Sequence, residues 1–188
     1  MTTKYEKLLG LYKYLKRKIS GQHVVFHHVP KCGGTSLNRA LRLRYFISQR
    51  SIMANPSIHS LNTFNPELED DKFNFNKGIR DFRRKILNYY LQSDVSYVAG
   101  HVTFSDSTFE SFKDRYKFIT VIRHPVDRFI SEYIHRANKF NTHYNTKLGL
   151  EEYLETDSAI IASRVLCEYF SSSQKMAKEY NDDDYGKA

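Results

Sequence analysis

The apolar residues of the chain follow two spacings, which predict strands and helices in alternation. Three short runs rich in β-branched and aromatic residues predict buried strands over residues 23–29, 95–102 and 116–122. Elsewhere apolar residues recur every three or four positions, and this spacing predicts helices over residues 1–20, 35–46, 78–91, 105–114, 125–135, 148–155 and 157–170. Strands that alternate with helices favour a parallel sheet covered on both faces.

This alternation predicts the fold class α/β, in the form of a three-layer, P-loop-like domain with a central, mainly parallel β-sheet flanked by helices. The chain has 188 residues, the usual length of one domain, so we expect residues 1–188 to form a single domain. The polar, acidic tail over residues 181–188 is expected to fray.

The helix predicted after the third strand has an apolar and a polar face. The residues expected to be buried are Val126, Phe129, Ile130, Tyr133 and Ile134. The residues expected on the opposite face are His124, Asp127, Arg128, Ser131 and His135. Pro125 suits the first turn of this helix, because its missing N–H is not needed there.

Residues 48–77 show little periodicity and are expected to form a long loop or lid. They contain Asn55-Pro56, Asn65-Pro66 and an acidic run, with at most a short strand near residues 51–54. Loops of this length in compact domains are commonly functional, so substrate contacts are expected here.

The formal net charge of +8 indicates an anionic partner, which could be a nucleic acid, a membrane surface, a nucleotide or an acidic polysaccharide. The basic residues lie in no recognised nucleic-acid-binding motif, which disfavours a nucleic-acid partner. The basic amphipathic helix over residues 1–20 either caps the core or contacts an anionic membrane or polymer. Oligomeric state is left open.

Cysteine usage and hydropathy favour a soluble protein in a reducing compartment. Cys32 and Cys167 are far apart, so no disulfide framework is indicated. No apolar run is long enough to span a bilayer, and the first residues lack the apolar core of a signal peptide. We therefore expect a cytoplasmic protein.

The stretch VVFHHVPKCGGTSL, residues 24–37, combines a strand, a glycine turn and a helix start. Main-chain N–H groups at such a junction, with Lys31 beside them, favour a bound phosphate. Thr35 and Ser36 are expected to cap the helix. Because Lys31 precedes the glycines and no Gly-Lys-Ser/Thr follows, a magnesium-dependent kinase is disfavoured. No acidic residue or Cys/His cluster with metal-ligand spacing accompanies this stretch, so no metal is expected.

Two further strand ends carry functional side chains. His101 follows the second strand and Arg123 follows the third, and the carboxyl ends of parallel strands share one edge of the sheet. Three other histidines compete with His101, namely His27, His28 and His124. Since successive strand residues face opposite ways, one of His27 and His28 is expected in the core and the other near the site.

Three segments resemble the sulfotransferases that use 3′-phosphoadenosine 5′-phosphosulfate (PAPS). They are FHHVPKCGGTSL at 26–37, AGHVTF at 99–104 and FITVIRHPVDRFISEY at 118–133. The resemblance is to the Golgi-type carbohydrate enzymes and their bacterial relatives, and in motif to the uronyl or heparan sulfate 2-O-sulfotransferases. The missing anchor of the Golgi enzymes favours a bacterial or viral source.

The resemblance implies roles for individual residues. It assigns the 5′-phosphosulfate to the loop formed by Lys31, Cys32, Gly33, Gly34, Thr35 and Ser36, with Cys32 where relatives usually have Thr. It assigns the 3′-phosphate to Arg123 and Ser131. His101 matches the general base of the 2-O-sulfotransferases, and Lys31 would offset charge on the leaving phosphate. The Asn-Gln-Thr type segment of many relatives is missing from the C-terminal third.

The implied reaction is in-line transfer of the sulfuryl group from PAPS to a hydroxyl, with adenosine 3′,5′-bisphosphate as the product and no metal. The implied acceptor is a carbohydrate, and the basic surface favours an anionic one. The alternative is a nucleotide- or polyanion-binding module of the same fold without turnover.

Overall fold

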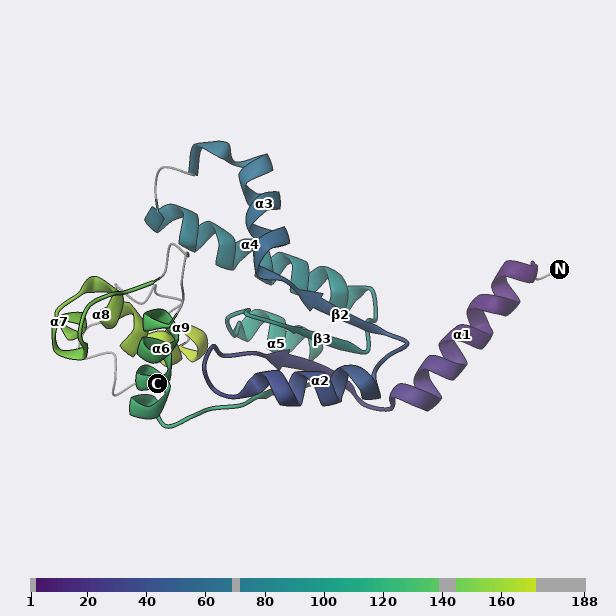
Figure 1. Cartoon of the computed structure of the whole chain (residues 1–188). Helices are drawn as coiled ribbons and strands as arrows, with labels where there is room; N and C mark the ends of the chain where they lie inside the picture. Colours follow the sequence, from purple (N-terminus) through teal and green to yellow (C-terminus); the bar gives the residue numbers. More distant parts are fainter. Residues whose placement is uncertain (1–2, 69–71, 139–144, 172–188) are drawn as a thin grey trace.

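A parallel sheet forms the centre of the computed structural model, which describes residues 3–68, 72–138 and 145–171 (Figure 1). Its strands, in the spatial order β2-β3-β1-β4, are β1 (His23–His27), β2 (Gln49–Ile52), β3 (Tyr97–Gly100) and β4 (Tyr116–Thr120). In the central strand β1, Val24 pairs with Tyr97 of β3 and His23 pairs with Tyr116 of β4. The predicted α/β class with a parallel sheet is confirmed, and the strand positions are those expected, apart from β2.

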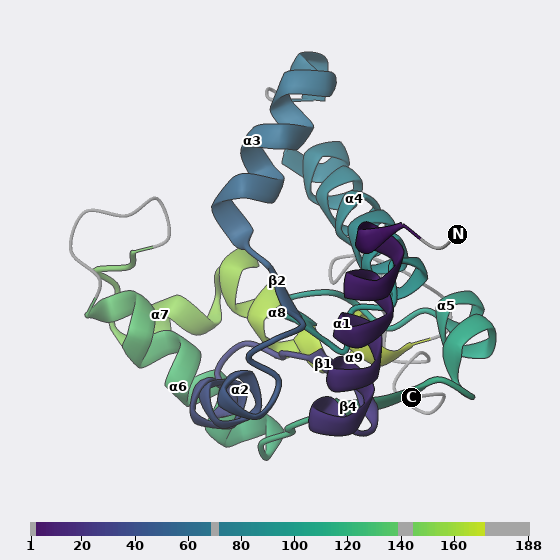
Figure 2. The same ribbon diagram turned by 90° about the vertical axis from the view of Figure 1, so that its right-hand side faces the viewer.

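Helices cover both faces of the sheet and gather at one of its ends. They are α1 (Lys4–Ser20), α2 (Gly34–Arg44), α3 (Ala54–Phe64), α4 (Lys72–Gln92), α5 (Asp106–Phe112), α6 (Pro125–Ala137), α7 (Leu150–Leu154), α8 (Asp157–Ser163) and α9 (Val165–Phe170). Figures 1 and 2 show α6 to α9 gathered beyond the carboxyl ends of the strands, whereas α1 projects from the opposite end. The carboxyl ends of the strands therefore lie within a group of helices.

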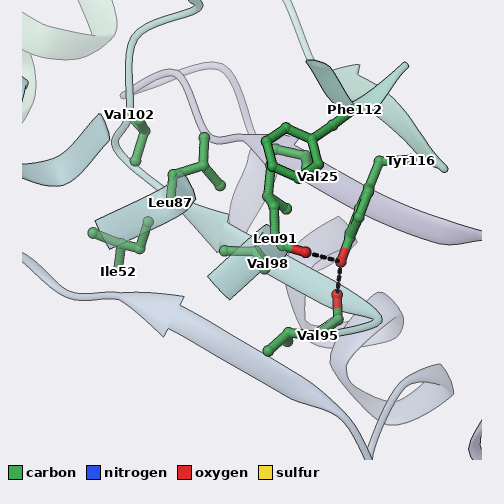
Figure 3. Close-up of a cluster of buried hydrophobic side chains, with 9 residues drawn as sticks. All are labelled: Val25, Ile52, Leu87, Leu91, Val95, Val98, Val102, Phe112 and Tyr116. Carbon is green, nitrogen blue, oxygen red and sulfur yellow. Dashed lines mark hydrogen bonds between the residues drawn. The ribbon is translucent and has the colours of Figure 1, made fainter. Parts of the chain in front are cut away.

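Strand alternation divides the core into two layers. On one face, Val25 and Val98 pack with Leu87 and Leu91 of α4 and with Phe112 of α5 (Figure 3). The residues of the other face, packed against α2, are Val24, Phe26, Tyr97 and Ala99, with Leu37 and Leu41 from the helix. The sheet is thus covered on both faces, as its apolar strands require.

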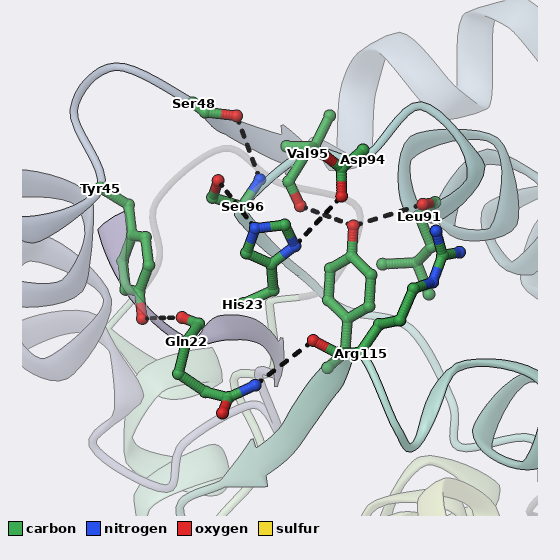
Figure 4. Close-up of polar contacts among 10 residues, drawn as sticks. Gln22, His23, Tyr45, Ser48, Leu91, Asp94, Val95, Ser96 and Arg115 are labelled. Carbon is green, nitrogen blue, oxygen red and sulfur yellow. Dashed lines mark hydrogen bonds and ion pairs between the residues drawn. The ribbon is translucent and has the colours of Figure 1, made fainter. Parts of the chain in front are cut away.

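Polar contacts fasten the amino ends of the strands (Figure 4). His23 Nδ1 lies 3.3 Å from the carboxylate of Asp94, its Nε2 lies 3.5 Å from the hydroxyl of Ser96, and Tyr116 donates to the carbonyl of Val95 at 2.9 Å. Ser, His and Asp are the residue types of a hydrolase triad, but Ser96 is fully buried, at 0% exposed, so a substrate does not reach its hydroxyl. The cluster is structural.

The segment over residues 48–77, expected to be a long loop or lid, is largely regular structure. It contains β2, α3, a 3₁₀ turn η1 (Pro66–Leu68) and the first residues of α4. Pro56 does not break α3, because it occupies the first turn, where no intrahelical hydrogen bond is lost. The dipeptide Asn65-Pro66 does end a helix, since Asn65 is the C-cap of α3.

Two other expectations are changed, and one lies outside the described residues. The single helix expected over residues 157–170 is broken at Arg164, which ends α8 and precedes α9. The basic helix expected at the N-terminus is present as α1, but it does not cap the core: its side chains from Lys4 to Leu15 are exposed. The tail over residues 181–188 is not among the residues described. Single-domain organisation stays a prediction.

Candidate active site at the carboxyl edge of the sheet

The loop between β1 and α2, residues 28–33, is the first part of the candidate site. Two of its residues have left-handed backbone conformations, Lys31 at φ 65° and Gly33 at φ 80°. Glycine adopts this conformation freely, but a lysine does so only under constraint from its surroundings. At the start of the loop, the N–H of His28 donates to the carbonyl of Gly100 at 3.0 Å, which holds the loop backbone against β3. The loop is therefore a defined turn that fixes where Lys31 leaves the backbone.

The N-terminus of α2 opens onto this loop without a side-chain cap. Gly33 is the N-cap, so Thr35 and Ser36, expected as caps, lie instead in the first turn, where both are exposed. The first N–H groups of an α-helix have no intrahelical partner and attract anions. The arrangement of glycine turn and helix start can thus bind a phosphate or sulfate group.

Gly34 is required for a reason that the sequence did not reveal. A Cβ built on Gly34 would lie 2.6 Å from the His28 ring and 2.9 Å from Phe26. The missing side chain therefore makes room for His28, which stacks on Phe26 with ring centroids 5.4 Å apart.

Beside this loop lies a cavity of about 360 Å³ that brings three of the predicted residues together. Lys31 from the loop, Arg123 from the segment after β4 and Ser131 from α6 all line it. The other lining residues are Asp127, Ile130, Ile134, His135 and Asn138. A guanidinium, an ammonium and a hydroxyl around one cavity form a donor set suited to an anion.

The buried face of α6 differs from the expectation. Arg128, expected on the polar face, is 1% exposed and donates a hydrogen bond to the carbonyl of Ala162 in α8. Val126, Ile130 and Ile134, expected to be buried, are exposed. The helix is thus rotated relative to the expectation, and its buried Arg128 joins α6 to α8 through this hydrogen bond. Burial lowers the pKa of Arg128.

His101 follows β3 directly and is fixed by the loop after β1. Its Nδ1 lies 2.6 Å from the carbonyl oxygen of His28, and the two imidazole rings stack with centroids 4.8 Å apart. A carbonyl oxygen only accepts, so Nδ1 carries the proton and Nε2 holds the available lone pair. Burial lowers the pKa of His101, the hydrogen bond to His28 partly opposes this effect, and the nearby Arg83 cation adds a smaller lowering.

The other histidines occupy different environments. His27 is buried, its Nδ1 lies 2.8 Å from the carbonyl of Val102, and its pKa is lowered by burial. His28 is half-buried beside His101, so the two adjacent histidines face opposite sides, as strand alternation predicts. His124 is exposed as the N-cap of α6.

Two residues near His101 were not found from the sequence. Arg83 of α4 donates from Nε to the hydroxyl of Ser57 in α3 at 2.9 Å, and its Nη1 lies 3.5 Å from the carbonyl oxygen of His101. Ser57 also lines a groove of about 630 Å³ between α3 and α4. No sequence signal marked Arg83, since it lies among other basic residues of a helical pattern.

Helix α9 packs against the loop between β1 and α2. Val29 and Cys32 pack with Tyr169 of α9 in a separate apolar cluster. Cys32 is therefore buried, with a free thiol, in this cluster. The N–H of Phe104 donates to the carbonyl of Tyr169 at 2.8 Å, which joins the segment after His101 to the same helix.

Across the described part of the chain, no group of three or more His, Cys, Asp or Glu side chains is arranged to bind a metal ion. None of the described helices has the length and hydropathy needed to cross a membrane.

Neither the curated proteins nor the solved structures include a significant match to the chain. A family model described as "Sulfotransferase family" matches residues 19–182, a range that includes β1 to β4 and every predicted site residue, and the chain therefore belongs to this family.

Proposed function

We propose that this sulfotransferase transfers the sulfuryl group of PAPS to a carbohydrate hydroxyl, with His101 as the general base. One observation carries the proposal: Lys31, Arg123 and Ser131, which come from two distant parts of the sequence, line a single cavity. The loop that presents Lys31 also orients His101 through the carbonyl of His28. Donor binding and proton removal would thus take place at one edge of the sheet.

The residues around the cavity fit a donor that carries two separate anionic groups. Arg123 can hold one phosphate through two N–H donors, with the Ser131 hydroxyl beside it. Lys31 and the first N–H groups of α2 can hold a second anionic group. When bound, PAPS supplies an activated sulfuryl group attached to its 5′-phosphate. The ammonium of Lys31 would offset the negative charge that develops on the leaving phosphate oxygen.

The environment of His101 suits a base. Because its pKa is lowered, the imidazole is neutral at pH 7, as an acceptor of a proton must be. The hydrogen bond from Nδ1 to His28 leaves Nε2 to take the proton of the acceptor hydroxyl. The acceptor oxygen then forms its bond to sulfur while the bond from sulfur to the leaving phosphate oxygen breaks.

The groove between α3 and α4 is our proposed approach for the acceptor. It adjoins His101 through Ser57 and Arg83, and the side chains that line it include Phe82, Tyr89 and Lys85. Aromatic rings offer flat apolar surfaces for the C–H faces of a sugar, and the ammonium of Lys85 favours an anionic substituent. These features support a carbohydrate acceptor with acidic groups.

Calorimetric titration with adenosine 3′,5′-bisphosphate tests the donor site. We expect micromolar binding by the unaltered chain, and a loss of about tenfold to a hundredfold in Lys31→Ala and in Arg123→Ala, because each change removes a charged donor. Lys117→Ala, an exposed lysine on β4, is the matched control and should bind normally. Failure of the unaltered chain to bind in the micromolar range would contradict PAPS as the donor.

Transfer of radiolabelled sulfate from PAPS to a panel of neutral and acidic glycans tests the remaining steps. We expect activity that prefers acidic glycans and is lost in His101→Ala. Lys85→Ala should reduce the preference for acidic glycans, whereas Lys77→Ala, another exposed lysine of α4, should not. Bisphosphate binding without transfer to any glycan would favour a binding module over an enzyme.

A further inference from the structure

Helix α1 stands apart from the rest of the molecule. Figure 1 shows it projecting beyond the amino ends of the strands, and Figure 2 shows it in front of the sheet from the second direction. Every side chain described in this helix, from Lys4 to Leu15, is exposed. The proposed function uses none of them.

Large apolar side chains gather along one side of this helix. Leu8, Leu11, Tyr12 and Leu15 follow the spacing of a single helical face, and Leu8 and Leu11 are 60% and 55% exposed. An isolated exposed leucine is ordinary, but a continuous apolar face on an exposed helix marks an interaction surface.

The start of the helix is fixed by its own sequence. The N–H of Thr3 donates to the carboxylate of Glu6 at 2.7 Å, and the N–H of Glu6 reaches the hydroxyl of Thr3 at 3.3 Å. This reciprocal pair is a capping box, which fixes the start of a helix locally. The apolar face is therefore presented by a helix that needs no protein partner to define its first turn.

The charge of the helix indicates which kind of surface it meets. Its sequence carries one acidic residue, Glu6, and six basic ones, Lys4, Lys7, Lys13, Lys16, Arg17 and Lys18. A second copy of the helix would bring the same positive charge and be repelled. Anionic lipid headgroups would instead neutralise that charge, while leucine and tyrosine side chains enter the interface.

We propose that α1 binds the surface of an anionic lipid bilayer and lies in its interface. The helix is too short and too charged to cross the membrane. Only Gly21 and Gln22 separate it from β1, whose opposite end leads into the loop with Lys31. Attachment through α1 would leave the carboxyl edge of the sheet uncovered, so nucleotide binding and lipid binding should be independent.

Cosedimentation of the full chain with vesicles tests this proposal. We expect binding to vesicles of phosphatidylcholine mixed with phosphatidylglycerol to exceed binding to phosphatidylcholine alone by at least about tenfold, and to weaken as salt is added. Adenosine 3′,5′-bisphosphate should not compete. Equal binding to both vesicle types, or to neither, would overturn the proposal.

Paired variants identify the helix as the lipid-binding element. Leu8→Gln with Leu15→Gln removes apolar contacts, and Lys7→Glu with Lys13→Glu reverses charge; each pair should abolish sedimentation with the vesicles. Leu43→Gln with Leu154→Gln, two exposed leucines elsewhere, is the matched control and should bind normally. Thermal unfolding followed by circular dichroism verifies that each variant folds. Normal lipid binding by the α1 variants would contradict the proposal. So would a chain that binds no lipid but self-associates, if the leucine pair abolishes that self-association.

Discussion

The imidazole of His101 donates a hydrogen bond from Nδ1 to the main-chain oxygen of His28 at 2.6 Å. This oxygen belongs to the backbone of the loop that carries Lys31. The orientation of His101, the proposed base, is therefore coupled to the conformation of the proposed anion site. No side-chain substitution at position 28 removes this acceptor. The same loop therefore determines which nitrogen of His101 is available for chemistry.

The pH dependence of sulfate transfer should report on His101. Neutral His101 is the active form, so activity should rise with pH through its pKa, and burial sets that pKa below the ordinary 6.5. Arg83→Gln removes a cation that lowers the pKa, so the acidic limb of the profile of kcat/KM should move to higher pH. Arg84→Gln, whose arginine pairs with Asp81, should leave the limb in place. An unmoved limb in Arg83→Gln would count against His101 as the base.

Gly34→Ala should destabilise the fold by about 1–3 kcal/mol, because the added methyl group would overlap the ring of His28 and displace it. Urea unfolding measures the effect. Gly10→Ala is the control: it adds the same methyl group to a helix where nothing lies within 4 Å, and it should not lower stability. Equal stability of Gly34→Ala and the unaltered chain would show that the His28 ring is not confined as described.

Arg128→Met should lower the free energy of unfolding by about 1–3 kcal/mol, because the carbonyl of Ala162 loses its buried donor. Methionine preserves most of the side-chain volume, so the effect reports on the hydrogen bond more than on a cavity. The exposed Arg39 of α2 provides the comparison, and Arg39→Met should change stability by less than about 0.5 kcal/mol. If both variants unfold alike, Arg128 does not fasten α6 to α8.

Acid should weaken the fold partly through His27. Its pKa is lowered in the folded chain, so between pH 6.5 and that lower value the unfolded chain binds more protons, and stability falls as the pH falls. One such group contributes a slope of up to about 1.4 kcal/mol per pH unit. His27→Asn keeps a donor toward Val102 but does not titrate, so the slope should decrease. His59→Asn, at an exposed position, should leave the slope unchanged.

Much of the fold could be predicted because the strands carry their own signal. Residues 24–26 and 97–99 are all apolar or aromatic, and so are residues 116–119 apart from Lys117; such runs form the buried strands of a parallel sheet. Strand β2 gave a weaker signal, at most a short strand near residues 51–54, since its first residues, Gln49, Arg50 and Ser51, are polar or charged. The other edge strand, β4, was predicted because Tyr116, Phe118 and Ile119 are apolar or aromatic.

The candidate site was predictable where it depends on chain order and not where it depends on packing. Lys31, His101 and Arg123 each follow a parallel strand, and that position alone brings them to one edge of the sheet. The burial of Arg128 depends on the carbonyl of Ala162, a contact between residues far apart in sequence that no local pattern encodes. The approach of Arg83 to His101 is of the same kind.

The central position of β1 also has a consequence for synthesis on the ribosome. The strand that leads into the loop with Lys31 is among the first parts of the chain to be made, but its neighbours are Tyr97 on one side and Tyr116 on the other. Until the second of these has emerged, an edge of β1 offers unpaired main-chain groups to other nascent chains. The anion-binding loop is thus synthesised early, but the strands on both sides of β1 are synthesised later. Chaperone binding during translation should therefore be greatest between the synthesis of β1 and that of β4.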